Sequence, residues 1–277
     1  MLTVVAGPCG SGKTHWIWQQ MIAQEDAKPL AYISPATVGV DAYRLSLNVP
    51  QLQVEHDLPE TSHAIRQAAE QQTIYLELGC YLSLDLPELA KIPHRQVAVV
   101  SPDCFAHTDW VRSDWEQWAD EVVINAVPLA KITASKTTAS KTTAIESEFV
   151  DSKTDLWQAS LRGQVLDPAS LHLFWQELVQ GAYGRLIRAK AVFELADGDA
   201  IYVDHLPHQE TTYQDLPLPK WLNGRPQRFS GIEMMGQGLD KGAIAATLSD
   251  CCLDDATLKS HQAALKESQA YLSQEAA

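Results

Sequence analysis

The residues best suited to chemistry lie near the amino terminus, at positions 7–14. They follow the pattern G-x-x-x-x-G-K-T and are Gly7, Pro8, Cys9, Gly10, Ser11, Gly12, Lys13 and Thr14. Glycines in such a loop allow successive backbone N–H groups to point inward at phosphate oxygens. Lys13 then reaches the β- and γ-phosphates of a nucleotide, and the Thr14 hydroxyl ligates Mg²⁺. The pattern predicts a nucleotide-binding phosphate loop, with Lys13 as a candidate catalytic residue.

The segments on either side of this loop are those that a phosphate site requires. Residues 2–6 are apolar and predict a buried strand, whereas residues 14–22 predict a helix. A helix N-terminus carries unsatisfied N–H donors and the positive end of the helix dipole, and both favour an anion. A chance match in a glycine-rich turn is the alternative, but it does not explain why strand, loop, Lys-Thr pair and helix are in register.

Apolar strands alternate with helices over the first 130 residues. Strands are predicted at 29–34, 73–78, 96–101 and 121–125, and helices at 62–70 and 109–120. Near-continuous apolar strands separated by helices indicate a parallel sheet with both faces covered. The predicted fold class is α/β, a P-loop NTPase domain with a mostly parallel sheet.

A second, smaller unit is predicted after residue 160. Its predicted strands are 185–195, 200–205 and 227–235, and its predicted helices are 167–180, 239–252 and 255–275. Asp167 followed by Pro168 is typical of a helix start, and Asp197-Gly198-Asp199 is typical of a hairpin turn. Strands grouped together with helices on one side indicate a small α+β domain.

These elements divide the chain into four predicted segments. They are a phosphate-loop domain (1–130), a Thr/Ser/Lys-rich insertion and connector (131–160), the α+β domain (161–253) and a polar helix and tail (254–277). Within the connector, the sequence of residues 133–137 is repeated at once in residues 138–142. Such small polar residues bury too little apolar area to offset the entropy of ordering. We expect residues 131–146 to be mobile, and a phosphorylated switch is the alternative.

Composition narrows the class of protein. The formal net charge of −14 argues against a general nucleic-acid binder, which needs a basic surface. No segment approaches the roughly 18–20 apolar residues of a membrane span, and the N-terminal strand and loop leave no room for a signal peptide. The sequence has only five cysteines, and an odd number cannot all pair in disulfides. This count favours a reducing cytoplasm, where cysteines stay as thiols.

Several motifs of the second unit resemble the CobW group of GTPases, relatives of the UreG and HypB metallochaperones. Residues 184–196, GRLIRAKAVFELA, are similar to a strand of that family, and residues 225–229, 236–240 and 248–253 resemble its closing motif. The resemblance implies a cytoplasmic protein that hydrolyses GTP with Mg²⁺ and hands a divalent metal to a client protein. It extends over most of the chain apart from the repeat and the C-terminal tail.

The metal-binding Cys-x-Cys-Cys motif of that family has no counterpart here. No cysteine lies between Asp41 and Glu77, where the family carries it, and soft thiolates are what select Zn²⁺. We therefore expect no transition metal at a site of this type, although Cys80 and Cys104 leave a weak two-thiol site open. Two other groups of side chains could also hold a metal. The first group is interpreted as a solvated loop and comprises Glu55, His56, Asp57 and His63. The second group is interpreted as an exposed turn and comprises Asp204, His205 and His208.

Glu77 resembles the acidic motif of the family. It falls at the end of the predicted strand 73–78, where the resemblance places the Mg²⁺ and the attacking water of a nucleotide. Glu77 is therefore the second candidate catalytic residue, and the alternative is that it only terminates a strand.

The family's base-reading motif is only partly present. Asn125 is kept and is a candidate nucleotide-binding residue, but Ala126 and Pro128 replace the lysine and the aspartate. Because a carboxylate makes strong hydrogen bonds to the guanine edge and proline makes none, we expect poor discrimination between GTP and ATP. Asp155 is a second candidate for reading the base.

The sequence is compatible with two functions. The first is nucleoside-triphosphate binding and slow hydrolysis coupled to metal-cofactor or protein assembly, with GTP favoured by the resemblance. The second is a scaffold or sensor that binds nucleotide without hydrolysis and has lost metal transfer. A small-metabolite kinase is disfavoured by the C-terminal motifs. The expected partners are a nucleotide and a client protein, without nucleic acid or membrane, and a homo-oligomer is left open.

Overall fold

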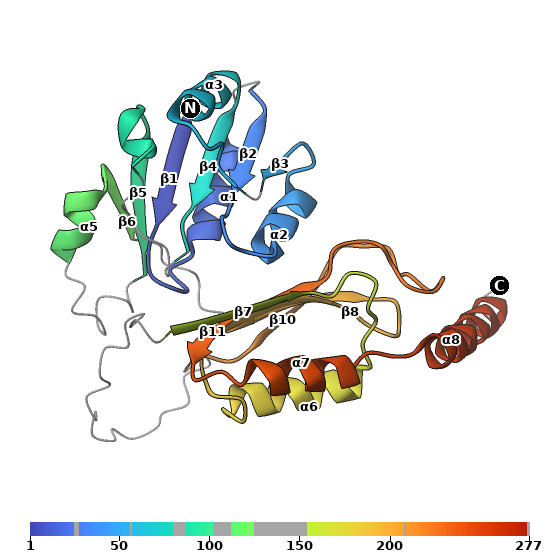
Figure 1. Ribbon diagram of the computed structural model, residues 1–277. Coiled ribbons are helices and arrows are strands. Elements are labelled where there is room, and N and C mark those ends of the chain that lie inside the picture. The colour runs from blue at the N-terminus through green and yellow to red at the C-terminus, as the bar shows by residue number, and fades with distance from the viewer. Residues whose placement is uncertain are drawn as a thin grey trace, which may run out of the picture. The chain divides into compact units, whose positions relative to one another are not determined.

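The structure, a computed structural model, describes residues 1–24, 28–55, 57–79, 87–101, 112–124, 154–207 and 209–275 (Figure 1). The chain divides into two compact units, described separately below. Unit 1 comprises Met1–Ala36 and Asp41–Asp151, and unit 2 comprises Thr37–Val40 and Ser152–Ala277. The predicted insertion at 131–146 lies outside the described residues.

Unit 1 contains a six-stranded sheet in the order β3-β2-β4-β1-β5-β6, and every neighbouring pair is parallel. The strands are β1 (Leu2–Ala6), β2 (Leu30–Ile33), β3 (Gln53–Glu55), β4 (Thr73–Glu77), β5 (Arg95–Val100) and β6 (Glu121–Ile124). The helices are α1 (Lys13–Ala23), α2 (Val40–Asn48), α3 (Ser62–Gln71) and α5 (Arg112–Trp118), with a 3-10 turn η1 at Leu89–Lys91.

Helices pack on both faces of this sheet. One buried apolar cluster joins α3 and α5 to the sheet through Ile65 and Trp115. The cluster on the opposite face joins α1 and α2 to it through Ile17 and Leu45. Because both faces are covered, the strands can be apolar along their whole length, as the five consecutive buried residues of β1 show. The predicted α/β fold class with a parallel sheet is confirmed.

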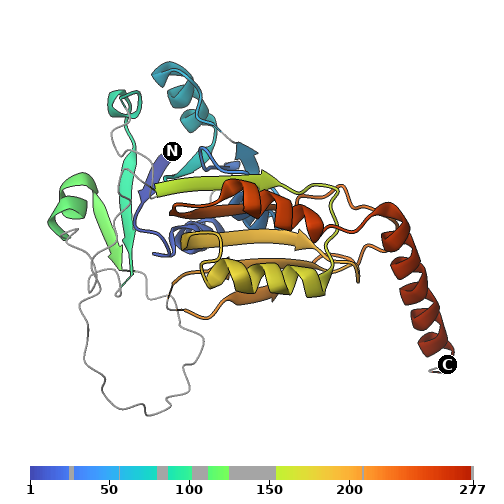
Figure 2. The ribbon, with the colours of Figure 1, turned by 60° about the horizontal axis from the view of Figure 1, so that its bottom comes forward.

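Unit 2 contains a five-stranded antiparallel sheet in the order β10-β9-β8-β11-β7. The strands are β7 (Thr154–Ser160), β8 (Arg185–Glu194), β9 (Ala200–His205), β10 (Thr212–Asp215) and β11 (Gly231–Gln237). The helices are α6 (Pro168–Val179), α7 (Lys241–Asp250) and α8 (Asp255–Glu275). Figure 2 shows α6 and α7 side by side along one face of the sheet, which is the predicted α+β arrangement.

Aromatic packing and a helix cap fix α6 on this sheet. Trp175 meets Phe193 of β8 edge to face, with ring centroids 6.1 Å apart, and both side chains are fully buried. Asp167 caps the helix by accepting the Ser170 N–H at 2.8 Å. Asp167 and Pro168 therefore begin the helix as the sequence predicts.

A buried ion pair ties β8 to the segment before β11. Glu194, only 1% exposed, accepts hydrogen bonds from Arg228 Nε at 2.5 Å and Arg228 Nη2 at 2.8 Å. Arg228 also donates to the Pro219 carbonyl at 2.8 Å. The strand predicted at 227–235 begins only at Gly231, and Arg228 lies in the segment before it.

Several short elements are absent from the sequence prediction. Strand β7 lies within the segment interpreted as a connector, and its residues are mostly only half-buried because it forms an edge of the sheet. All four residues of β10 are exposed, and β3 has only three residues. Edge strands of this kind lack the apolar signal on which the prediction depends.

Candidate functional site

The phosphate loop follows the strand at which the sheet order diverges. Strand β1 lies between β4 and β5, with Val5 opposite Glu77 of β4 and opposite Val97 of β5. The carboxyl ends of parallel strands share one edge of a sheet, and ligands of such sheets bind there at the switch in strand order. The loop and Glu77 therefore meet at the edge where a nucleotide is expected.

Two glycines of the loop have backbone conformations or surroundings that exclude a side chain. Gly7 has φ of 153°, and a Cβ at this position would lie 2.0 Å from the Val99 carbonyl oxygen. Gly12 precedes α1 with φ of 86°, a region that residues with a Cβ rarely adopt. These contacts give a physical reason for glycine at both positions of the motif.

Lys13 lies folded into its own loop. Its Nζ donates to the Gly7 and Pro8 carbonyl oxygens, each at 3.0 Å, and the residue is only 7% exposed. The Ser11 N–H also donates to the Pro8 oxygen at 3.3 Å. Both groups are donors that a phosphate loop directs at phosphate. A bound phosphate would replace these neutral carbonyl oxygens with charged ones, which make stronger hydrogen bonds.

Thr14, Glu77 and Tyr32 form a hydrogen-bonded cluster beside the loop. The Thr14 hydroxyl lies 3.1 Å from Oε1 and 2.9 Å from Oε2 of Glu77. The Tyr32 hydroxyl, from β2, donates to Glu77 Oε2 at 2.9 Å. The sequence predicts the first two residues and misses Tyr32, whose only signal is a hydroxyl in an otherwise apolar strand. The structure brings Thr14 and Glu77 together.

The electrostatics of this cluster keep Tyr32 protonated. Burial raises the pKa of Tyr32 well above its usual value, and the negative charges of Glu77 and Asp41 raise the pKa further. Tyr32 is fully buried, and Glu77 and Asp41 are each 7% exposed. Tyr32 therefore acts as a fixed donor that orients the Glu77 carboxylate.

The oxygen atoms of this cluster fit Mg²⁺. Magnesium prefers hard oxygen ligands and is held in proteins by one or two side chains together with the phosphates of a nucleotide. The Thr14 hydroxyl and the Glu77 carboxylate supply such oxygens within 3.1 Å of each other. They are the residues that would hold the ion and its ordered water.

Cys9 has a covalent partner. It is disulfide-bonded, and the partner is not among the described residues, where the other cysteines, Cys251 and Cys252, are free. The cysteine count did not predict a disulfide, because the positions of cysteines in a sequence do not show which of them are neighbours in the fold.

The two candidates for reading the base have different outcomes. Asn125 lies outside the described residues. Asp155 belongs to β7 of unit 2, where its carboxylate accepts the Leu239 N–H at 3.2 Å and pairs with Lys241 Nζ at 3.3 Å. The Leu239 N–H and the Lys241 ammonium lower the pKa of Asp155. The Asp155 carboxylate therefore binds residues at the start of α7 and in the turn before it.

The turn expected to be exposed at Asp204 and His205 is largely buried. His205 is 6% exposed, and its Nδ1 lies 3.0 Å from Thr211 Oγ1. Asp204 accepts hydrogen bonds from Arg188 at 2.9 Å and Tyr202 at 3.0 Å. The exposed interpretation is wrong because these residues end a paired strand, β9, in which His205 is buried and the Asp204 carboxylate is hydrogen-bonded. His208 and His56 lie outside the described residues, among which no three His, Cys, Asp or Glu side chains gather as a metal site.

We expect His205 to make unit 2 sensitive to acid. Burial lowers the pKa of His205, so the unfolded chain takes up a proton near pH ~6.5 while the folded chain resists it. Stability is therefore full above about pH 6.5 and falls below it, by at most about 1.4 kcal/mol per pH unit. Urea unfolding at several pH values should show a flatter dependence for His205→Asn than for wild type. The exposed His172→Asn should behave like wild type, and equal slopes for all three proteins would refute the assignment.

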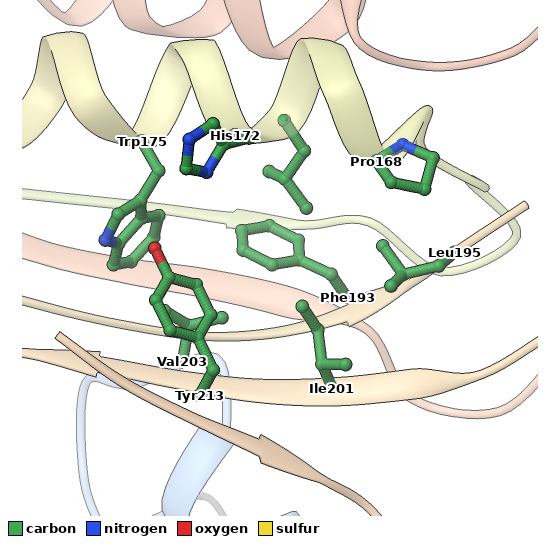
Figure 3. Close-up of a pocket in the computed structure, with 9 residues that line it drawn as sticks. Pro168, His172, Trp175, Phe193, Leu195, Ile201, Val203 and Tyr213 are labelled. Atoms are coloured by element: carbon green, nitrogen blue, oxygen red, sulfur yellow. The ribbon is translucent and has the colours of Figure 1, made fainter.

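A small apolar cavity lies between α6 and the sheet of unit 2 (Figure 3). Its volume is about 130 Å³, well below the roughly 300–1,000 Å³ of small-molecule pockets. It is lined by Pro168, Leu171, His172, Trp175, Phe193, Leu195, Ile201, Val203 and Tyr213. A cavity of this size and lining is a gap in side-chain packing, too small for a nucleotide-sized ligand.

The fold and the loop geometry define the class of protein: an α/β protein with a phosphate loop after its central strand, followed by an antiparallel α+β unit. Residues 160–252, about a third of the chain, match the family model described as "Cobalamin synthesis protein cobW C-terminal domain". Residues 160–252 are therefore similar to the cobW C-terminal domain, and the CobW-like resemblance drawn from the sequence is confirmed in this region.

Solved structures give a weaker comparison. The Zn(II)-bound YjiA GTPase from E. coli is similar at 10% identity and a TM-score of 0.32, with 90% of this chain and 98% of that chain covered. A Zn(II)-bound triple mutant of YjiA GTPase gives 11% identity, the same TM-score and the same coverage. A TM-score of this size carries no conclusion. Curated proteins yield no match, and none of the helices described is long and apolar enough to cross a membrane.

Proposed function

We propose that the protein binds a Mg²⁺–nucleoside triphosphate at the phosphate loop and hydrolyses it slowly to drive assembly of a metal cofactor or a client protein. The observation that carries the proposal is the Thr14–Glu77 pair at the carboxyl edge of a parallel sheet, in a loop whose lysine is buried against the loop carbonyls. A structural turn has no need of a buried lysine, a hydroxyl and a carboxylate at one place. A phosphate-binding site needs all three.

Each residue has a role in this proposal. Lys13 moves from the Gly7 and Pro8 carbonyls to the β- and γ-phosphates, and the loop N–H groups hold the remaining phosphate oxygens. Thr14 would ligate the ion, which when bound would supply charge neutralisation on the phosphoryl group. Glu77 orients the attacking water, and Tyr32 holds its carboxylate in place. Catalysis of this type comes from positioning and charge.

The nucleotide and the client are the less specific parts of the proposal. The cobW C-terminal domain favours GTP, because the CobW group that the sequence resembles consists of GTPases. The replacement of the base-reading lysine and aspartate by Ala126 and Pro128 removes the groups that reject ATP. We therefore propose a cytoplasmic protein with weak base preference, and a metal client is the one that the cobW domain suggests.

A non-hydrolysing scaffold or sensor is the second candidate. The observation that favours it is the absence from residues 41–77 of the sequence of any cysteine that would carry metal. This candidate shares the phosphate loop and differs in turnover. Release of inorganic phosphate from Mg²⁺–GTP or Mg²⁺–ATP therefore separates the two candidates.

Calorimetric titration with GTP and ATP side by side, with and without Mg²⁺, tests the proposal. We expect both nucleotides to bind in the presence of Mg²⁺, with affinities that differ by less than about a hundredfold. A site that hydrogen-bonds a base edge rejects analogues more strongly than that only while its polar groups are present. The absence of heat for either nucleotide with reduced protein would contradict binding. A larger preference for GTP would show that an unrecognised group reads the base.

A further inference from the structure

A short segment from the N-terminal half of the chain, Thr37–Val40, belongs to unit 2. The residues on either side of it, up to Ala36 and from Asp41 onward, belong to unit 1. The chain therefore passes from β2 into unit 2 and returns to unit 1 in the first turn of α2. The segment is thus joined covalently to unit 1 at both of its ends.

Glu233 of β11 holds this segment by its backbone. Its Oε1 accepts the Gly39 N–H at 3.1 Å and the Val40 N–H at 3.2 Å. The first N–H groups of a helix have no partner within the helix, and the positive end of the helix dipole favours a carboxylate there. Glu233 is only 7% exposed, and hydrogen bonds to an ionised acceptor are stronger than neutral ones. The carboxylate therefore fixes the point at which α2 begins.

Two residues of the same sheet keep this contact in place. Lys190 of β8 lies directly opposite Glu233 in the strand register, and its Nζ is 3.3 Å from Glu233 Oε2. Gly231 of β11 allows Val38 to approach the strand, because a Cβ on Gly231 would lie 3.3 Å from Val38 Cγ2. The segment is thus held to β11 by packing as well as by hydrogen bonds.

The backbone is strained where the chain enters the segment. Ala36 has φ of 59°, a left-handed conformation that residues with a Cβ rarely adopt. Gly39 has φ of 101°, which glycine tolerates. Strained backbone persists only where the surrounding structure holds it, and it is common at functional sites. The hydrogen bonds that Glu233 accepts from Gly39 and Val40 are part of what holds it.

The segment lies in the chain between two residues of the phosphate site. Tyr32, shortly before the segment, donates to Glu77 Oε2 at 2.9 Å. Asp41 directly follows Val40, is 7% exposed, and lies close enough to Tyr32 for its charge to act on the hydroxyl. Short stretches of backbone join both residues to the segment, so a restraint on Gly39 and Val40 limits how far they can move.

We propose that Glu233 is a positioning residue of the phosphate site. By holding the start of α2 it fixes Tyr32 and Asp41, and through Tyr32 it fixes the carboxylate of Glu77. This inference rests on the proposed hydrolysis and adds a contribution of unit 2 to it. A displacement of about 1 Å at a reacting group lowers a rate by roughly a hundredfold, so a small loss of restraint has a large effect on turnover.

The test measures the release of inorganic phosphate from Mg²⁺–GTP and Mg²⁺–ATP by the full chain. We expect Glu233→Ala to lower kcat at least about tenfold and to leave KM within about threefold of the wild-type value. Nucleotide binding is retained because the loop donors and Thr14 are unchanged. Glu233→Gln keeps an oxygen that can accept both N–H groups and should recover most of kcat.

Val40→Pro removes one donor from the other side of the same contact. Proline suits the first position of a helix, and β11 is unchanged, so this variant should show the same loss of kcat with unit 2 intact. Arg188→Met is the control, because it breaks the Arg188–Asp204 pair between β8 and β9, and it should behave like wild type. Hydrogen exchange in Glu233→Ala and Val40→Pro should be faster in peptides of residues 37–48 and unchanged in peptides of β8.

The outcomes separate this inference from the proposed function. Wild-type kcat in Glu233→Ala, or a change in KM alone, overturns the positioning role and leaves the proposed function intact. Equal losses in Glu233→Ala and Arg188→Met show a general effect of disturbed sheet packing and also overturn it. If Glu233→Ala unfolds unit 2, Val40→Pro decides by the same criteria. If the wild-type chain releases no phosphate, the proposed hydrolysis fails and the positioning role fails with it.

Discussion

Lys13→Ala is expected to bind Mg²⁺–GTP and Mg²⁺–ATP at least about tenfold more weakly than wild type. Lys13 is the residue of the loop that carries a full positive charge, and its Nζ lies within 3.0 Å of the loop carbonyls. A hydrogen bond from a charged group contributes roughly 1.5–3 kcal/mol, and about 1.4 kcal/mol corresponds to a tenfold change in affinity. Calorimetry on the reduced protein measures this change directly.

Lys220→Ala is the matched control for the lost charge. Lys220 pairs with Asp199 on the surface of unit 2, and its side chain is 51% exposed. This variant should bind nucleotide like wild type. Thermal unfolding of Lys13→Ala must also be measured, since Lys13 is buried in its loop. Equal affinities of wild type and a folded Lys13→Ala would mean that the loop does not bind phosphate.

Arg228→Ala is expected to lower the free energy of unfolding of unit 2 by about 3–5 kcal/mol. The substitution leaves the carboxylate of Glu194, whose side chain is 2% exposed, without the arginine that holds both of its oxygens. An unpaired buried charge costs far more than the net gain from the pair itself. Urea unfolding followed by hydrogen exchange in peptides of β8 and β11 assigns the loss to unit 2.

The double variant Glu194→Leu/Arg228→Met tests the reason for this loss. It removes both charges and retains apolar volume, so its stability should return to that of wild type or exceed it. Lys220→Ala breaks an exposed pair and should cost no more than about 1 kcal/mol. If Arg228→Ala also lowers the free energy of unfolding by less than about 1 kcal/mol, the Glu194 carboxylate must find another partner in the variant.

The long apolar elements were predictable from the sequence, and the short edge elements were not. Strand β9 and the polar helix α8 were predicted with the boundaries that the structure gives, and the hairpin turn Asp197-Gly198-Asp199 marks where β9 begins. Strands β7 and β10 lie at the two edges of their sheet, so one side of each pairs with no strand in the part of the chain that the structure describes. Their residues are largely exposed or half-buried and carry no clear pattern.

The candidate site was predictable where residues are close in sequence. The spacing of the residues from Gly7 to Thr14 predicts the loop. The position of Glu77 at the end of a predicted strand makes it a candidate site residue. Tyr32 and the disulfide of Cys9 depend on which strands and loops become neighbours in space. A single sequence contains no signal for such pairings. His205 was judged exposed because a proline follows nearby, whereas the side chain is buried at the end of β9.

The central place of β1 in its sheet determines when during synthesis the phosphate loop can form. Strand β1 pairs on one side with β4 and on the other with β5, so β1 must wait for two partners that emerge from the ribosome after it. Domains fold as units during synthesis, beginning with the N-terminal one, and pairings between distant segments are slow to form. The nascent chain therefore carries an unformed phosphate loop until β5 has been translated.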